Sequence, residues 1–187
     1  MTAPTDSEGA TPAVAPSAPG RMVTFDLDDA RFTLRAAAVC LHQGYVLLHR
    51  AEHDDFWAMP GGRVEVMEPA AETLRREMLE EIGVEVQVGG LLWLVENYFE
   101  HGGRRHHELG LYFRIELPED SAQLDKHLPF VGLEEGLKLY FEWFAVEELE
   151  NVRLFPSFLR TALARPPAHP VHVVHHDEDE PPAAATT

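Results

Sequence analysis

One segment, GRVEVMEPAAETLRREMLEEIGV at residues 62–84, constrains this chain more than any other. Between residues 69 and 82 its apolar side chains recur at steps of three and four, which predicts a helix with one buried face. Glu77, Glu80 and Glu81 fall on a different face, and like charges at this spacing destabilise an isolated helix by roughly 0.2–0.5 kcal/mol per pair. A helix that keeps such glutamates either exposes them to water or holds a cation.

The sequence also marks the ends of this helix. Pro69 suits the first turn, where its missing N–H costs nothing, and Gly83 suits the left-handed residue that follows a helix. Pro60-Gly61-Gly62 precedes the segment and predicts a turn whose backbone approaches a ligand closely. The glutamates are therefore expected to face this turn. Oxygen ligands in this number suit Mg²⁺, which binds through a few carboxylates together with substrate phosphates.

Composition limits the classes of function. The chain has 187 residues, of which 45% are hydrophobic, and this suits one domain with a real core. The formal net charge of −17 repels nucleic-acid polymers and anionic membranes. Small phosphorylated ligands remain compatible with this charge when a cation mediates their binding.

The cellular compartment is predicted from the scarcity of cysteine and from the lack of a membrane span or signal-peptide pattern. The single cysteine, Cys40, lies in an apolar run and is expected to be a buried, inert thiol. No apolar run reaches the roughly 18 residues of a membrane span, and the N-terminus has no signal-peptide pattern. We therefore expect a soluble cytoplasmic protein.

Three regions are predicted along the chain. Residues 1–20 and 166–187 are rich in small residues, proline or histidine and acids, and both are expected to be disordered tails. Residues 21–165 form the domain, within which residues 118–138 are expected to be a loop. Strand-like runs on both sides of the helix and a second helix near the end predict an α/β or α+β layered domain. The expected strands are residues 32–39, 45–49, 84–88, 91–99, 108–117 and 139–144, and the expected second helix is 156–164.

The central segment resembles the Nudix box, G-x5-E-x7-R-E-U-x-E-E-x-G-U, where U is an aliphatic residue. Every specified position from Gly62 to Val84 is filled, with Met78 as a permissive U. The approach WAMPGG at 57–62 is also similar to that of many members, and the resemblance covers roughly residues 30–165. A solvated helix face explains the run REMLEE on its own, but it does not explain the remaining fixed positions or the turn before them.

This resemblance implies a fold, a reaction and a set of roles. The fold is an α/β/α sandwich with a mixed central sheet. Members mostly hydrolyse a nucleoside diphosphate linked to another group, with Mg²⁺ as cofactor and Mn²⁺ as a substitute. Glu77 and Glu81 would be the principal metal ligands, Glu80 a further ligand or a contact through water, and the Gly61 carbonyl would complete the shell. Arg76 would hold a neighbouring glutamate, and we count Glu77, Glu80 and Arg76 as the catalytic residues.

Residues outside the box remain open to two interpretations. Arg50 and Arg63 flank it and would contact substrate phosphates, or they are plain surface charge. Glu134 or Glu135 would be a general base, or part of a solvated acidic loop. Met67 stands where members often place a glycine, and this puts the shape of the loop in question.

We predict a Mg²⁺-dependent hydrolase of a phosphoanhydride bond in a small nucleotide-type substrate. One alternative is a module on the same fold that senses a nucleotide without cleaving it, although a sensor has no need of the intact glutamates. Another is an isomerase or other metal enzyme, which would release no phosphate product. Homodimers are common in such families, so a homodimer is included among the expected partners.

Overall fold

The apolar run at residues 36–40 lies in the centre of a long strand, β2 (Ala30–His42), in a computed structural model that describes residues 21–134 and 136–177. Its side chains alternate between two cores. Ala36, Ala38 and Cys40 join the core beneath helix α1 (Ala70–Ile82), whereas Ala37 and Val39 join the core on the other side. A strand buried on both faces explains a continuous apolar run instead of an alternating one. Cys40 is buried as expected, and burial raises the pKa of its thiol to about 12.

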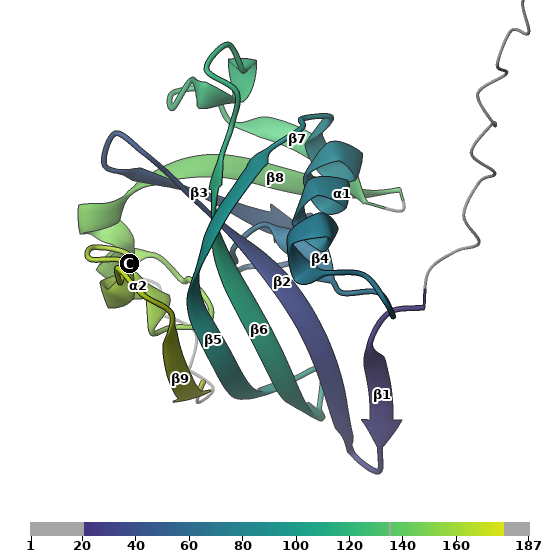
Figure 1. Cartoon of the computed structure of the whole chain (residues 1–187). Helices are drawn as coiled ribbons and strands as arrows, with labels where there is room; N and C mark the ends of the chain where they lie inside the picture. The colour runs from purple at the N-terminus through teal and green to yellow at the C-terminus, as the bar shows by residue number, and fades with distance from the viewer. Residues whose placement is uncertain (1–20, 135, 178–187) are drawn as a thin grey trace, which may run out of the picture.

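Helices lie on both sides of one mixed sheet (Figure 1), so the α/β/α expectation is confirmed. The second core is covered by the 3₁₀ helix η2 (Val146–Asn151) and the short helix α2 (Leu159–Ala162). Within the described residues the remaining elements are β1 (Thr24–Leu27), β3 (Tyr45–Ala51), β4 (Gly61–Arg63), β5 (Gln87–His101), β6 (Arg104–Glu116), η1 (Ala122–Leu124), β7 (Phe130–Glu134), β8 (Leu137–Ala145) and β9 (Val171–His176).

The strand order brings distant segments of the chain together. The main path is β7-β8-β3-β2-β6-β5-β9, and both β1 and β4 also pair with β2. The β2–β6 and β5–β9 pairs are parallel, whereas the other pairs are antiparallel. Strand β4 places its two glycines beside Ala36 and Ala37 of β2. The turn before the box is thereby fixed against the centre of the sheet, next to α1.

Helix α1 has the predicted limits with one correction. Pro69 is not in the first turn: it precedes the helix with an extended backbone. At the other end, Gly83 has the expected left-handed φ of 70°; its N–H donates to the Leu79 carbonyl, and the Val84 N–H donates to the Met78 carbonyl. Leu74 and Met78 are fully buried against the sheet. This anchors the helix and fixes the direction of its glutamates.

Two expectations about irregular structure were wrong. Residues 118–138 contain η1 and β7, and the second element was missed because its sequence, FVGLE, is short and carries a glycine. The predicted C-terminal tail contains β9, which pairs with β5 over six residues. Its isolated run VHVVHH becomes a strand because β5 offers an edge and Val173 packs on the core. The expected tails at 1–20 and 178–187 lie outside the described residues.

Candidate active site

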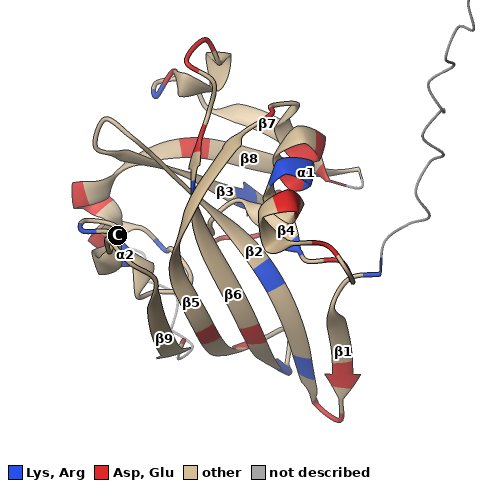
Figure 2. Ribbon diagram, viewed as in Figure 1, with Lys and Arg blue, Asp and Glu red and all other residues tan. Residues whose placement is uncertain are grey.

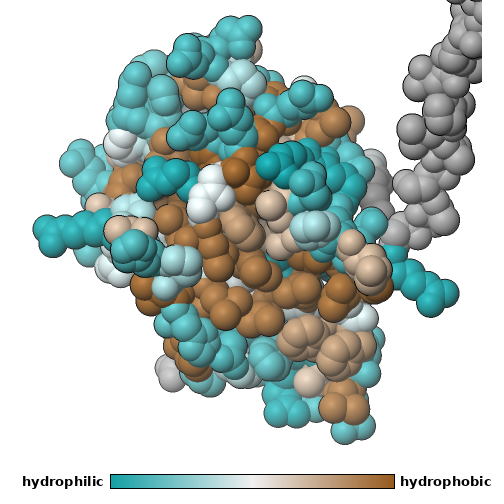
Figure 3. All heavy atoms as spheres, viewed as in Figure 1, coloured by the Kyte–Doolittle hydropathy of each residue, from teal (hydrophilic) through white to brown (hydrophobic). Residues whose placement is uncertain are grey.

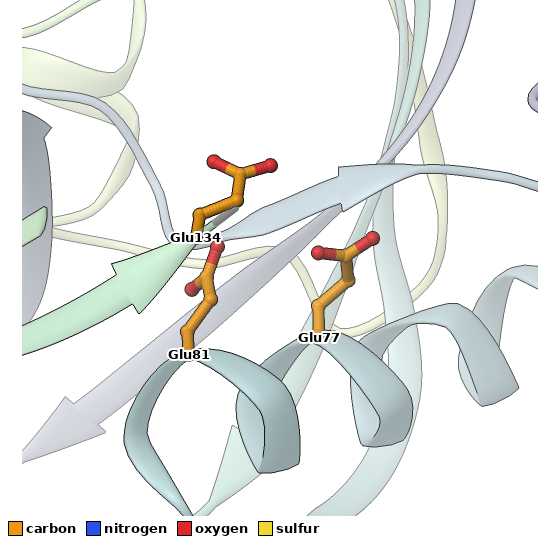
Figure 4. A group of neighbouring side chains, drawn as sticks. All are labelled: Glu77, Glu81 and Glu134. Carbon is orange, nitrogen blue, oxygen red and sulfur yellow. The ribbon is translucent and has the colours of Figure 1, made fainter. Parts of the chain in front are cut away.

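Two elements bring three carboxylates together. Glu77 and Glu81 project from neighbouring turns of α1, and Glu134 reaches them from the end of β7 (Figure 4). One carboxylate oxygen from each residue lies within 4.8 Å of the others. Carboxylates at this separation repel one another, and a hard divalent cation between them would remove the repulsion.

Glu81 is the group in this cluster that most needs a cation. Its side chain is buried, with 4% of the residue exposed, and neither carboxylate oxygen has a hydrogen-bond partner among the described residues. Burial, followed by the charge of Glu77, raises the pKa of Glu81 to about 8. Burial also raises the pKa of Glu77, although the Arg76 guanidinium opposes this effect. A buried carboxylate without partners is costly unless it is protonated or ligated.

Arg76 ties the box together. Its Nη1 donates to Glu77 at 2.8 Å and to Glu80 at 3.2 Å, while its Nε and Nη2 donate to the two oxygens of Glu68 at 2.9 and 3.1 Å. Thr73 also donates to Glu68, at 2.8 Å. Burial alone would raise the pKa of Glu68, but these hydrogen bonds outweigh it and the pKa is lowered. The resemblance implies that Arg76 holds a neighbouring glutamate, and Arg76 does contact Glu77. That this contact positions Glu77 for metal binding stays a prediction.

Glu80 lies in a different environment from Glu77 and Glu81. Its side chain is 61% exposed and pairs with Arg76. Figure 2 shows that acidic and basic positions both occur along α1. Glu80 borders the same hollow, of about 310 Å³, as Glu77, Glu81 and Glu134, although it is not one of the three clustered carboxylates. A contact of Glu80 with a ligand through water stays a prediction.

The glycines of β4 are required by close approach. A Cβ atom built on Gly62 would lie 2.1 Å from the carboxyl carbon of Glu77, and one on Gly61 would lie 2.3 Å from the Ala36 carbonyl oxygen. The Gly61 carbonyl, expected to ligate the metal, accepts a hydrogen bond of 2.8 Å from Arg35. Its metal contact therefore stays a prediction, and it would use the second lone pair of that oxygen.

A larger cavity of about 360 Å³ adjoins the hollow. Glu134 lines both spaces and so connects the acidic cluster with the cavity. Arg50 lines the larger cavity, where its guanidinium lies 5.4 Å from the ring centroid of Trp57 and 4.9 Å from that of Tyr140. Arg63 lines neither space among the described residues. Of the two predicted substrate-binding arginines, the structure brings only Arg50 to the site.

The inner wall of this cavity carries unpaired polar atoms. Asn97 is 4% exposed, and its Oδ1 has no hydrogen-bond partner among the described residues. The Nδ1 of His49, also buried, has none either. Burial, followed by the nearby charge of Arg35, lowers the pKa of His49 to about 3, so the ring is neutral near pH 7. Both residues line the cavity, where a ligand can reach them.

Sequence reasoning missed several of these positions. Arg35, Asn97 and Asp177 line the cavity, yet none belongs to the box. Arg35 and Asn97 interrupt apolar strands, and that interruption was the available signal. Nothing in the sequence near Asp177 pointed to a pocket. Glu134 was one of two proposed bases, and the other, Glu135, lies outside the described residues.

Comparison with known proteins places these features in context. A model of the NUDIX domain matches residues 32–165. Diphosphoinositol polyphosphate phosphohydrolase 2 of Rattus norvegicus is 28% identical over 125 residues, which is 65% of this chain and 69% of that protein. The low-salt glycan biosynthesis protein Agl8 of Haloferax volcanii is 31% identical over 115 residues, which is 56% of this chain and 74% of that protein.

Solved structures support the same fold. A NUDIX hydrolase from Nitrosomonas europaea superposes with a TM-score of 0.53 at 18% identity, covering 78% of this chain and 79% of the other. A UDP-X diphosphatase gives a TM-score of 0.53 at 18% identity, covering 75% of this chain and 66% of the other. At this identity the likeness concerns the arrangement of the backbone.

Proposed function

This chain belongs to the Nudix family, and from that premise we propose that it hydrolyses a pyrophosphate bond in a nucleoside diphosphate linked to another group. Mg²⁺ is the proposed cofactor, and Mn²⁺ would substitute for it. The observation that carries the proposal is Glu81, a buried carboxylate without a hydrogen-bond partner among the described residues, beside Glu77 and Glu134. This set of hard oxygen donors fits a divalent cation.

Each residue then has a defined task. Glu77 and Glu81 would hold the cation on one face of α1, and Arg76 would keep Glu77 in place. When bound, Mg²⁺ supplies charge neutralisation of the pyrophosphate and lowers the pKa of a coordinated water. Glu134 lines both the acidic hollow and the cavity, so it would accept the proton of the attacking water. Arg50 would contact a substrate phosphate at the wall of the cavity.

Product release tests the proposal directly. The protein is incubated with a panel of nucleoside triphosphates, nucleoside diphosphate sugars and dinucleotides in Mg²⁺ or Mn²⁺, and the phosphate and monophosphate products are measured. We expect Glu81→Gln to lower kcat at least about 100-fold, because it removes a charged metal ligand. Glu72→Gln is the matched control: it alters an exposed glutamate on the same helix, which pairs only with Arg75 among the described contacts.

The alternatives give different results. A sensing module would bind members of the panel and release no product with either metal, and this outcome would overturn the hydrolase proposal. An isomerase would convert its substrate without releasing phosphate or monophosphate, and mass spectrometry of the reaction mixture detects that change.

Partners and location complete the proposal. Within residues 21–134 and 136–177, none of the helices has the length and apolar character needed to cross a bilayer. A cytoplasmic location and a homodimer stay predictions. The homodimer is supported by apolar side chains that gather over the sheet beside α1 (Figure 3), and analytical ultracentrifugation of the purified chain would measure it.

A further inference from the structure

The cavity next to the acidic cluster has a wall of hydrogen-bond acceptors from three adjacent strands. Asn97 on β5 pairs in register with Glu108 on β6, and both side chains line the cavity. Asp177, directly after β9, lines it as well. Burial raises the pKa of Glu108, the nearby charge of Arg35 opposes this effect, and the charge of Asp177, which is close enough to act on Glu108, adds to it. These groups offer oxygen lone pairs to a ligand.

Strand β9 fixes Asp177 in this position. The Asp177 carboxylate accepts a hydrogen bond of 2.9 Å from the backbone N–H of Ser157 and lies 2.9 Å from Nε2 of His175. Its own N–H donates to the Tyr98 carbonyl at 3.0 Å. The segment lies beyond residue 165, where the match to the family ends. Asp177 and β9 therefore lie outside the matched range, whereas Asn97 and Glu108 lie inside it.

The positive charges in the cavity already have partners. Arg35 donates to the Gly61 carbonyl, Arg50 donates to the Asp54 carbonyl, and Arg153 pairs with the Asp55 carboxylate. Five carboxylates line the same space: Asp54, Glu100, Glu108, Glu134 and Asp177. Away from Arg50 and the acidic cluster, where the substrate phosphates are proposed to lie, such a cavity disfavours further anionic groups. A donor-rich, uncharged group fits it better.

The remaining walls suit a flat ring. Phe56 and Phe155 are in edge-to-face contact with centroids 5.7 Å apart, and Phe99 lines the same space. Aromatic side chains of this kind bind the π-face of a heterocycle without regard to its identity. The identity of the ring must then be selected by polar atoms at its edge, and on the wall formed by Asn97, Glu108 and Asp177 the oxygen atoms are acceptors.

On the basis of the proposed function, we propose that this cavity binds the nucleobase of the substrate and selects bases that carry an exocyclic amino group. Asn97 and Glu108 would accept the amino N–H groups, and Asp177 of β9 is a specificity-determining residue. A base with a carbonyl at the same position turns a lone pair toward the Asn97 oxygen and the carboxylates. A buried acceptor that loses its donor is left unpaired, which is why such sites discriminate strongly.

Matched pairs of substrates test this selection. Cytidine and uridine triphosphates differ in one amino group against a carbonyl, and adenosine and inosine triphosphates differ in the same way. We expect kcat/KM to favour the amino member of at least one pair by about tenfold or more. Binding of the uncharged nucleosides, followed by ligand-observed NMR without metal, should show the same preference, because it depends on the cavity alone.

Substitutions in the wall formed by Asn97, Glu108 and Asp177 test whether this wall causes the preference for amino-bearing bases. Asn97→Leu and Asp177→Asn should each reduce the preference at least threefold. Glu96→Gln is the control, since Glu96 lies next to Asn97 on the opposite face of β5 and contacts His172 of β9 instead of the cavity. It should keep the preference of the parent chain.

The outcomes separate this inference from the proposed function. Hydrolysis of both members of each pair at equal rates, with equal nucleoside binding, would overturn the inference and leave the hydrolase intact. Selective nucleoside binding without any hydrolysis would overturn the proposed function and support the cavity assignment. A preference that survives both Asn97→Leu and Asp177→Asn would overturn the role of this wall.

Discussion

At the scale of single residues, the site depends on the space that Gly62 leaves for the Glu77 carboxylate. A Cβ atom at this position would overlap that carboxylate, which is held from its other side by Arg76. Glycine is thus required here by contact distance, not by an unusual φ. The pattern of the box includes Gly62, but the reason for it appears only when β4 and α1 are placed side by side.

We predict that Gly62→Ala displaces Glu77 and lowers activity and metal affinity by about 10- to 100-fold, as expected when the support of a ligand is disturbed. Steady-state kinetics at increasing Mg²⁺ concentrations measure both effects. Gly90→Ala is the matched control, because no atom lies within 4 Å of a Cβ at that position. Equal losses in the two variants would show that the contact with Glu77 has no special role.

His49 predicts a pH dependence of folding. Burial lowers its pKa from 6.5 to about 3 in the folded chain, so at intermediate pH the unfolded chain binds more protons. The stability supplied by the neutral ring is complete above about pH 6.5 and is lost as the pH falls toward 3. At pH 5 the loss amounts to about 2 kcal/mol.

Urea unfolding of the parent chain and of His49→Leu at pH 7.5 and pH 5 would measure this contribution. We expect His49→Leu to reduce the difference in unfolding free energy between the two pH values by about 2 kcal/mol. His127→Leu removes an exposed histidine and should leave that difference unchanged. An unchanged difference in His49→Leu would contradict the assignment.

At the scale of elements, a helix or strand can be predicted from the sequence when the residues that fix its conformation lie within the segment itself. Helix α1 was predicted from its own periodicity and end residues, because Leu74, Met78 and Gly83 act within the segment. Strand β9 was not, since its hydrogen bonds come from β5, far away in sequence. The same holds for the cavity: the carboxylates of α1 were readable from spacing, whereas Asn97, Glu108 and Asp177 meet only through strand pairing.

The loop between β4 and α1 contains a strained residue. Met67 has a left-handed φ of 71° and is 95% exposed, in a turn closed by the Glu68 N–H and the Glu65 carbonyl at 3.1 Å. A side chain in this conformation costs about 1–2 kcal/mol, and glycine avoids most of that cost. Met67 therefore holds a conformation that glycine would adopt at lower cost.

We predict that Met67→Gly stabilises the chain by about 0.5–1 kcal/mol, after the greater freedom of glycine in the unfolded state is subtracted. Thermal unfolding monitored by circular dichroism would detect a higher Tm. Gln43→Gly tests the same principle at another positive φ, of 47°, away from the site. A lower Tm in Met67→Gly would mean that the methionine side chain contributes more than the strain costs.

At the scale of the whole molecule, charge has two separate consequences. The net charge of −17 destabilises the compact state through general repulsion, which any salt screens. The cluster of Glu77, Glu81 and Glu134 adds a local repulsion in a buried place, where screening by monovalent ions is weak. A divalent cation held by this cluster should therefore stabilise the fold more than ionic strength alone.

We predict that Mg²⁺ raises the Tm of the metal-free chain beyond the shift given by NaCl at equal ionic strength. At a concentration 100 times the Kd, the added free energy of unfolding is about 2.7 kcal/mol. Melting curves measured after chelation, with each salt added back in turn, separate the two effects. Glu81→Gln should remove the Mg²⁺-specific part and leave the NaCl part, while Glu72→Gln, at an exposed position of the same helix, should keep both. If NaCl and Mg²⁺ gave the same shift in the parent chain, the acidic cluster would not be a metal site.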